Sequence, residues 1–146
     1  MATPQEDLKR GVEHLGPLME AHGFAFSLTA IGNGSGGPFA AGEFTRGDRV
    51  LGVSVRTGLG LVEYRLGRLC ISHEDYLRYT GAWGSQDYPN FGGTVQDSFV
   101  ALEHDLRRFF AAFLSDDDAE FLRVIAARDA EPNKFKGLAG LGDRKR

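Results

Sequence analysis

The residue types best able to carry acid–base, metal or nucleophilic chemistry are four histidines and a single cysteine. The histidines are His14, His22, His73 and His104. No two of them have the spacing of a helical metal site, and none lies at ligand spacing from Cys70. No activating base stands beside Cys70 in the sequence, and the chain has no Gly-x-Ser-x-Gly elbow. We therefore predict no catalytic residue, no metal site and no cofactor, and we interpret Cys70 as a structural thiol.

The tripeptide His73-Glu74-Asp75 has two interpretations. An imidazole beside two carboxylates could contact a ligand, bind a metal or move a proton. The same carboxylates suit the first turn of a helix, because they offset the positive end of the helix dipole. We expect the acidic turn to be structural and keep His73 as a candidate ligand-contact residue.

The glycine-rich segment 32–38 invites comparison with a phosphate-binding loop. A phosphate cradle needs its glycines to lead into a helix N-terminus, whose free N–H groups hold the anion. This segment contains no lysine and leads into a predicted strand. We interpret it as a flexible connection after a strand over residues 24–31.

Residues 82–93 carry three aromatic side chains on a segment that predicts no regular structure: Trp83, Tyr88 and Phe91. Irregular segments of this length often carry function. The aromatic side chains could instead fold back as a lid over the core. Both interpretations stay open, and any interaction is expected here first.

Two glycine turns predict a β-meander in the middle of the chain. A two-residue turn at Gly47-Asp48 pairs Phe44 with Leu51, Gly42 with Val53 and Ala40 with Val55. A second turn at Gly58-Leu59 pairs Val55 with Val62, Val53 with Tyr64 and Leu51 with Leu66. Both registers place the large apolar residues of the central strand on one face, whereas a one-residue slip would scatter them. A third turn at Gly67-Arg68 leads into a short edge strand, Leu69 to Ile71.

The opposite face of this meander carries the charged residues Glu43, Arg56, Glu63 and Arg65. The registers give three rows: Glu43, Gly52 and Arg65; Ala41, Ser54 and Glu63; Phe39, Arg56 and Leu61. Paired acids and arginines on one face could bind a polar ligand or a partner protein. Antiparallel sheets also expose such a face to water without further function.

Helix signals flank the meander. Thr3 and Pro4 are typical of a helix start, and Gly16-Pro17 is expected to kink or split that helix. Ser72 is the expected N-cap of a short helix that ends at Gly81.

Two further helices are predicted after Thr94 and Ser115. Their expected buried residues are Phe99, Leu102, Leu106, Phe109 and Phe113 in the first, and Phe121, Leu122 and Ile125 in the second. The complete pattern predicts an α+β fold: an antiparallel β-meander of four to five strands, with an N-terminal helix and three C-terminal helices packed on one face.

Length and composition favour one domain and a tail. The chain has 146 residues, of which 42% are hydrophobic and 25% charged. We predict a single α+β domain over residues 1–131 and a disordered basic tail over residues 132–146. Residues 131–146 carry a net charge of +3 and the rest of the chain carries −6. The acidic body argues against nucleic acid as a partner.

Several absences in the sequence point to the cytoplasm. One cysteine cannot form an intramolecular disulfide, and the N-terminus lacks the basic and apolar regions of a signal peptide. No apolar run is long enough to span a membrane. The excess of Arg over Lys, with heavy use of Ala and Gly, is typical of a GC-rich bacterial genome.

We therefore expect a bacterial, non-enzymatic binding or regulatory module that acts through protein–protein contact, with a protein partner or a homodimer as its assembly. The alternative is a small-molecule-binding domain or modest enzyme, with a pocket between the sheet and residues 82–93. The expected contact residues are Glu43, Arg56, Glu63, Arg65, His73, Trp83, Tyr88 and Phe91.

Overall fold

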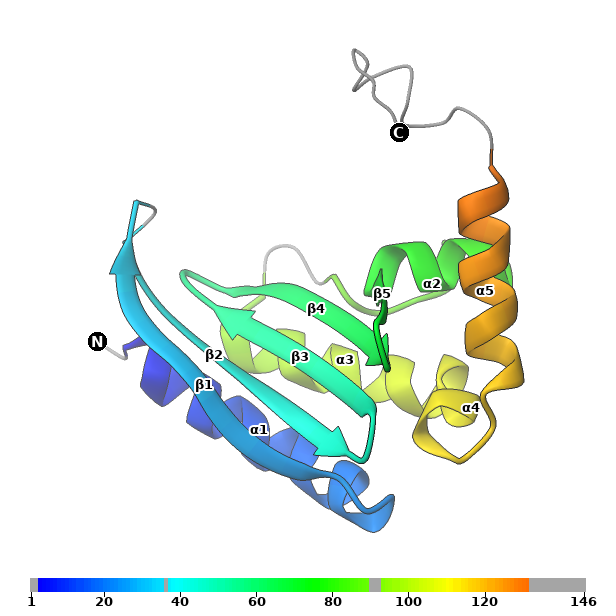
Figure 1. The fold of residues 1–146 in the computed structure, drawn as a ribbon. Coiled ribbons are helices and arrows are strands. Elements are labelled where there is room, and N and C mark those ends of the chain that lie inside the picture. The colour runs from blue at the N-terminus through cyan, green and yellow to red at the C-terminus, as the bar shows by residue number, and fades with distance from the viewer. Residues whose placement is uncertain (1–2, 36, 90–92, 132–146) are drawn as a thin grey trace.

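A five-stranded antiparallel sheet, in the order β1-β2-β3-β4-β5, forms the centre of the computed structural model (Figure 1). The structure describes residues 3–35, 37–89 and 93–131. The strands are β1 (Ala25–Gly34), β2 (Gly37–Arg46), β3 (Arg49–Val55), β4 (Leu59–Leu66) and β5 (Leu69–Ser72). The helices are α1 (Pro4–Ala21), α2 (His73–Thr80), α3 (Val95–Phe109), α4 (Ala111–Leu114) and α5 (Ala119–Ala130). The predicted α+β class is confirmed, whereas the predicted tail over residues 132–146 lies outside the described residues.

The first predicted register is confirmed, and the second is displaced by two residues. Leu51 lies opposite Phe44 on β2, as expected, but opposite Tyr64 on β4 rather than Leu66. The turn spans residues 56–58, closed by a hydrogen bond from Arg56 N to Gly58 O, and a bulge follows Ser54. A displacement of two residues keeps every side chain on its predicted face, because side chains alternate with a period of two. The three apolar side chains of β3 that were predicted to face the core are therefore buried: Leu51, Val53 and Val55.

The glycine-rich segment is not the loop we expected. β1 continues to Gly34 and β2 starts at Gly37, and these two residues pair across the hairpin. Gly37 has a φ of +100°, a conformation that glycine adopts readily and that allows this tight connection. The pairing of Gly32 with Phe39 extends the hairpin through residues that the sequence analysis assigned to a flexible connection.

Helix α1 begins as predicted and does not split at Gly16-Pro17. Thr3 and Glu6 form a reciprocal capping box at its start. Pro17 lies inside a helix that continues to Ala21, because a proline removes only one backbone donor from the helix. α1 and α3 lie together on one face of the sheet, behind it in Figure 1.

The C-terminal helices differ from the prediction at two apolar positions. α3 ends at Phe109, and the break before α4 turns the fully buried Phe110 into the core while Phe109 is only partly buried. In α5, Leu122 is 48% exposed and Val124 is fully buried. The predicted burial is therefore wrong at Phe109, where the next residue, Phe110, is buried instead. It is also wrong at Leu122, where Val124 is buried instead.

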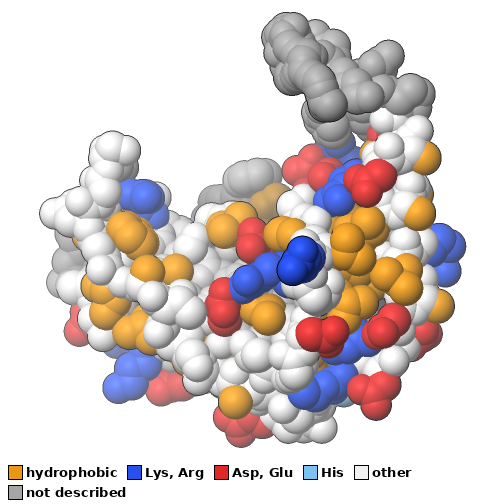
Figure 2. All heavy atoms as spheres, viewed as in Figure 1, with side chains coloured by type: hydrophobic (Ala, Val, Ile, Leu, Met, Phe, Trp, Pro, Cys, Tyr) orange, Lys and Arg blue, Asp and Glu red, His pale blue; other side chains and the backbone are white. Residues whose placement is uncertain are grey.

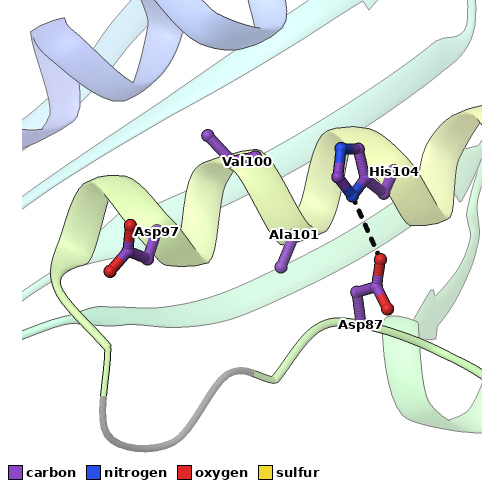
Figure 3. A pocket seen from close by; sticks show the side chains of 5 residues that line it. All are labelled: Asp87, Asp97, Val100, Ala101 and His104. Atoms are coloured by element: carbon purple, nitrogen blue, oxygen red, sulfur yellow. Dashed lines mark hydrogen bonds and ion pairs between the residues drawn. The ribbon is translucent and has the colours of Figure 1, made fainter.

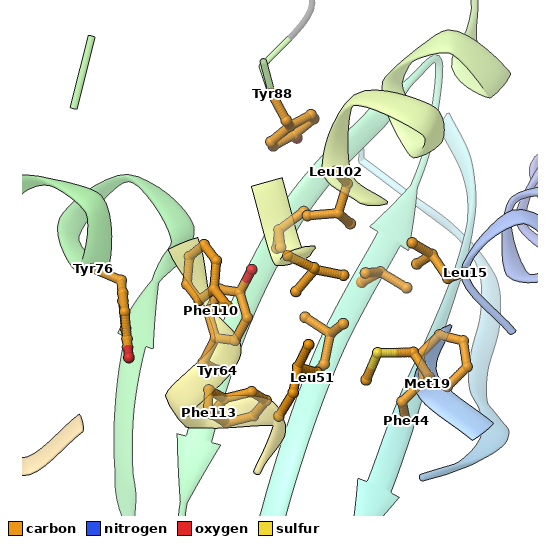
Figure 4. Close-up of a cluster of buried hydrophobic side chains, with 14 of the residues drawn as sticks. Leu15, Met19, Phe44, Leu51, Tyr64, Tyr76, Tyr88, Leu102, Phe110 and Phe113 are labelled. Carbon is orange, nitrogen blue, oxygen red and sulfur yellow. The ribbon is translucent and has the colours of Figure 1, made fainter. Parts of the chain in front are cut away.

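The core lies between the sheet and the helices (Figure 4). Its labelled side chains come from α1, from strands β2, β3 and β4, and from α2, α3 and α4. Two more come from connections: Tyr88 between α2 and α3, and Phe110 between α3 and α4. Among the described residues, no helix or strand covers the other face of the sheet, which faces the viewer in Figures 1 and 2. We call this uncovered surface the outer face. No helix in the described ranges is long and apolar enough to cross a membrane.

Candidate functional site

The outer face brings together three of the predicted contact residues, although not in the predicted rows. Glu43 and Glu63 both lie opposite Gly52, and Arg65 lies one row away, opposite Val50. Arg65 reaches diagonally and donates a hydrogen bond to the Glu43 carboxylate. Its Nε lies 3.9 Å from an oxygen of Glu63. We call Glu43, Glu63 and Arg65 the charged cluster.

Glycine at position 52 keeps the centre of this cluster open. A Cβ atom there would lie 3.5 Å from Cγ of Glu63, an ordinary van der Waals contact, so alanine would fill the space that glycine leaves beside this side chain. The three charged side chains are about a third exposed or less, and Nε of Arg65 is buried without a hydrogen-bond partner among the described residues. Such an unsatisfied donor is uncommon in native structures. The cluster thus combines a partly buried negative charge with an unused N–H group.

Apolar side chains flank the charged cluster. Leu61 is 49% exposed and lies opposite Ser54 on the outer face. Towards the β1–β2 hairpin, the Arg56 guanidinium lies 5.3 Å from the ring centroid of Phe39 and donates to Gly37 O at 2.8 Å. Among the described residues, no ion pair joins Arg56 to Glu63, although the predicted registers placed them in adjacent rows of this face. Figure 2 shows the result: charged side chains gather over the middle of the sheet, with hydrophobic side chains over β1 and β2.

The aromatic residues of segment 82–93 do not form one surface. Trp83 is 39% exposed, and the centroid of its ring lies 5.6 Å from the guanidinium carbon of Arg78 on α2. Tyr88 is buried, and its hydroxyl donates to the carbonyl oxygen of Leu59 at 2.7 Å. Phe91 lies outside the described residues. Tyr88 therefore fits the lid interpretation, and Trp83 fits the contact interpretation.

His73 lies in the core rather than on a contact surface, with only 3% of its surface exposed. It is the first residue of α2, directly after the edge strand, so its ring points back into the interior and stacks on Tyr64 and Phe110. Burial and the nearby Asp105 carboxylate raise the pKa of Tyr64 well above its ordinary value. The Tyr64 hydroxyl therefore stays protonated, and its oxygen shares a hydrogen bond of 2.7 Å with Nδ1 of His73.

Asp105 is the residue of this region that the sequence analysis missed. It is completely buried on α3, and its carboxylate lies 3.0 Å from Nε2 of His73. The same carboxylate accepts backbone hydrogen bonds from Asp87 N at 2.7 Å and Tyr88 N at 2.9 Å. One buried side chain thus joins α2, α3 and segment 82–89. An aspartate three residues after Leu102, on the buried stripe of α3, is the signal that could have revealed it.

Two hollows adjoin this segment. A cavity of about 410 Å³ lies between β4, the start of α2 and the segment, and its lining includes Leu61, His73, Glu74 and Tyr88. A second hollow of about 350 Å³ lies against α3, where Nδ1 of His104 is 3.1 Å from Asp87 (Figure 3). Within the part of the chain that the structure describes, no group of three or more His, Cys, Asp or Glu side chains could hold a metal ion.

Cys70 is exposed on the edge strand, and its surroundings do not activate it. Partial burial raises the pKa of the Cys70 thiol, and the charge and hydrogen bond of Glu63 raise it further. We expect Cys70 to react with iodoacetamide at neutral pH more slowly than free cysteine, because the thiolate is the reactive form. Glu63→Gln should speed the reaction several-fold, and Glu74→Gln should leave it unchanged. Mass spectrometry of the alkylated protein measures the rates, and equal rates in Glu63→Gln and the wild type would contradict this account.

Comparisons of the chain with protein-family models, with curated proteins and with solved structures find no match. The candidate site therefore stands on the geometry of the described residues alone.

Proposed function

We propose that this protein is a non-enzymatic binding or regulatory module that contacts another protein through the outer face of its sheet. The observation that carries the proposal is the uncovered face itself, where Leu61 is 49% exposed beside a partly buried charged cluster. Protein interfaces combine such apolar contacts with a polar surround. The proposal places the module in the bacterial cytoplasm.

The arrangement of the reactive side chains supports binding over catalysis. Both ring nitrogens of His73 are already hydrogen bonded, to Tyr64 and Asp105. The thiol of Cys70 has a raised pKa, which lowers its thiolate fraction. A general base or nucleophile needs a free reactive atom within reach of a substrate.

The apolar and charged side chains of the outer face indicate which groups a binding partner would need. A partner offers an apolar side chain to Leu61 and a hydrogen-bond acceptor to the accessible part of the Arg65 guanidinium, since the Arg65 side chain is 34% exposed. A basic side chain on the partner would complement the excess negative charge of Glu43 and Glu63. Trp83 and Arg56 extend the proposed contact at its margins.

Affinity purification from cells that make the protein tests this function. The wild type should retain a partner that Leu61→Glu and Arg65→Glu lose, because Leu61→Glu replaces the apolar contact with a charge that binding would bury, and Arg65→Glu removes the guanidinium that holds the Glu43 carboxylate. Leu122→Glu is the matched control, since Leu122 is 48% exposed and belongs to α5, a helix beyond the β5 edge of the sheet (Figure 1). If every protein retained by the wild type is retained equally by Leu61→Glu, the outer face is not the binding surface.

The cavity of about 410 Å³ beside Tyr88 favours a second candidate, a small-molecule-binding domain or modest enzyme. Of the expected contact residues, His73 and Tyr88 line it, whereas Arg56, Glu63 and Arg65 do not. A thermal-shift screen with metabolites and metal ions separates the two candidates. A ligand at a hundred times its dissociation constant adds about 2.7 kcal/mol to stability, and Gly60→Phe, which narrows the cavity, should abolish that shift.

A further inference from the structure

The two edges of the sheet differ in how they are protected. β5 has four residues, and Arg128 of α5 donates a hydrogen bond from Nη1 to the Cys70 carbonyl oxygen at 2.6 Å. Helices α2 and α5 lie beyond this edge (Figure 1). β1, at the opposite edge, has ten residues, and no strand in the described ranges pairs with its outer side.

β1 also lacks the residues that usually keep an exposed edge from pairing. None of residues 25–34 is charged and none is proline. Natural edge strands are commonly short, or blocked by lysine, proline or bulges. β1 has one bulge, between Leu28 and Ala30. A strand edge of this length and composition is a template for another strand.

The bulge places two exposed apolar side chains on the same face of β1. Leu28 lies opposite Gly42 and Ile31 lies opposite Ala40, and these partners are two residues apart on β2. Leu28 is 45% exposed and Ile31 is 54% exposed. A groove of about 200 Å³ between α1 and β1 adjoins Leu28; it is lined by Gln5, Leu8, Lys9, Val12, Phe26 and Leu28.

We propose that the protein forms a homodimer in which the β1 strands of two copies pair antiparallel about a twofold axis. The two five-stranded sheets then form one continuous sheet. With the axis between Thr29 and Ala30, Leu28 of each copy lies beside Ile31 of the other, next to the apolar groove. This dimer goes beyond the proposed partner binding and is independent of it, because it leaves the outer face free in both copies.

Charge and symmetry favour a second copy over a strand from another protein. Antiparallel self-pairing sets residues of β1 opposite residues of β1, and because the strand is uncharged, no like charges meet. The twofold axis buries Leu28 and Ile31 of both copies at once, as an isologous interface requires. A partner selected by charge would find no charged group on β1 to recognise.

Sedimentation and hydrogen exchange of the wild-type protein test the dimer without any substitution. The expected mass is twice that of a single chain. Backbone amides in residues 25–34 that point outward from the edge should exchange slowly, and their exchange should quicken on dilution. A monomer at high protein concentration, or fast exchange of these amides at every concentration, overturns the proposal.

Substitutions at the edge then locate the interface. Leu28→Lys and Ile31→Lys should each weaken the dimer by about two orders of magnitude, since each places a charged side chain against an apolar residue of the other copy, twice in every dimer. Leu61→Lys and Leu122→Lys, at leucines of similar exposure, should leave it intact. Mixing Leu28→Lys with Ile31→Glu should restore a dimer, because the introduced charges are opposite and adjacent. If neither Leu28→Lys nor Ile31→Lys changes the dimer, the proposal is overturned. If Leu61→Glu loses the partner protein and keeps the dimer, that result concerns only the proposed function of the outer face.

Discussion

Replacing Gly11 with alanine should destabilise the protein, although the same change in an exposed helix would stabilise it by about 1 kcal/mol. Gly11 is buried in α1 where that helix crosses α3. A Cβ atom at this position would lie 2.2–2.4 Å from three ring carbons of Phe99, closer than any atomic contact allows. Phe99 is fully buried and cannot move aside without displacing its neighbours. We expect Gly11→Ala to lower the free energy of unfolding by about 2–3 kcal/mol.

Gly16 in the same helix provides the matched control. A Cβ atom at Gly16 would meet only a Glu20 carboxylate oxygen, at 3.7 Å. The gain in helix propensity is partly offset because Gly16 precedes Pro17, so Gly16→Ala should change stability by less than about 1 kcal/mol. Urea denaturation of both variants measures the difference. If Gly11→Ala is as stable as Gly16→Ala, the close approach of α1 and α3 at this point is wrong.

Replacing Asp105 with alanine should produce the largest loss of stability among the polar residues considered. The change leaves three donors without their acceptor, two of them buried and the one from Asp87 partly buried: Nε2 of His73 and the backbone N–H groups of Asp87 and Tyr88. Each buried donor left unpaired costs about 1–3 kcal/mol, and the costs are not fully additive. We expect Asp105→Ala to lower the free energy of unfolding by about 3–5 kcal/mol.

The same substitution should loosen segment 82–89, because two of its backbone groups are held by the Asp105 carboxylate. Trp83 is the single tryptophan of the chain and reports on this segment. Its fluorescence should be quenched more efficiently by acrylamide in Asp105→Ala under conditions where the protein stays folded.

Asp129→Ala is the control for this prediction. Asp129 is exposed on α5, and its ion pair with Arg128 should contribute less than about 1 kcal/mol. Asp105→Asn keeps the volume of the side chain and one acceptor oxygen, so its stability should fall between those of the wild type and Asp105→Ala. An Asp105→Ala protein as stable as Asp129→Ala would show that the buried network contributes little.

Local sequence patterns were enough to predict much of the fold. The caps at Thr3, Ser72 and Thr94 form as expected, because a capping side chain bonds to a backbone group only three residues away. The burial of Leu51, Val53 and Val55 on β3 was also predicted correctly, although the second turn was placed at the wrong residues. Alternation along a strand depends only on whether a displacement is odd or even, and this displacement was two residues.

The candidate site was predicted less completely, since its contacts depend on register and packing. Arg65 was expected in the same row as Glu43, and it reaches Glu43 only because its side chain is long enough to cross a diagonal. The turn lies earlier than predicted, so that Val55 pairs with Leu59, and this turn together with the bulge after Ser54 sets Glu63 opposite Gly52 in the expected place of Arg65. The bulge shifts the alternation along β4, because Leu59 and Val62 are both buried although they are three positions apart. With Leu59 assigned to the turn, this break in the pattern gave no signal.

The sequence by itself determined which residues of each strand face the core, where three of the helices begin, and that the described sheet is antiparallel. Only the tertiary structure decided that His73 is buried against Asp105, 32 positions away, and that Tyr88 closes over β4. The physical reason is the range of the interactions. Caps and strand alternation involve residues close in the chain, whereas a buried hydrogen-bonded pair forms only after α2, α3 and the segment between them have packed together.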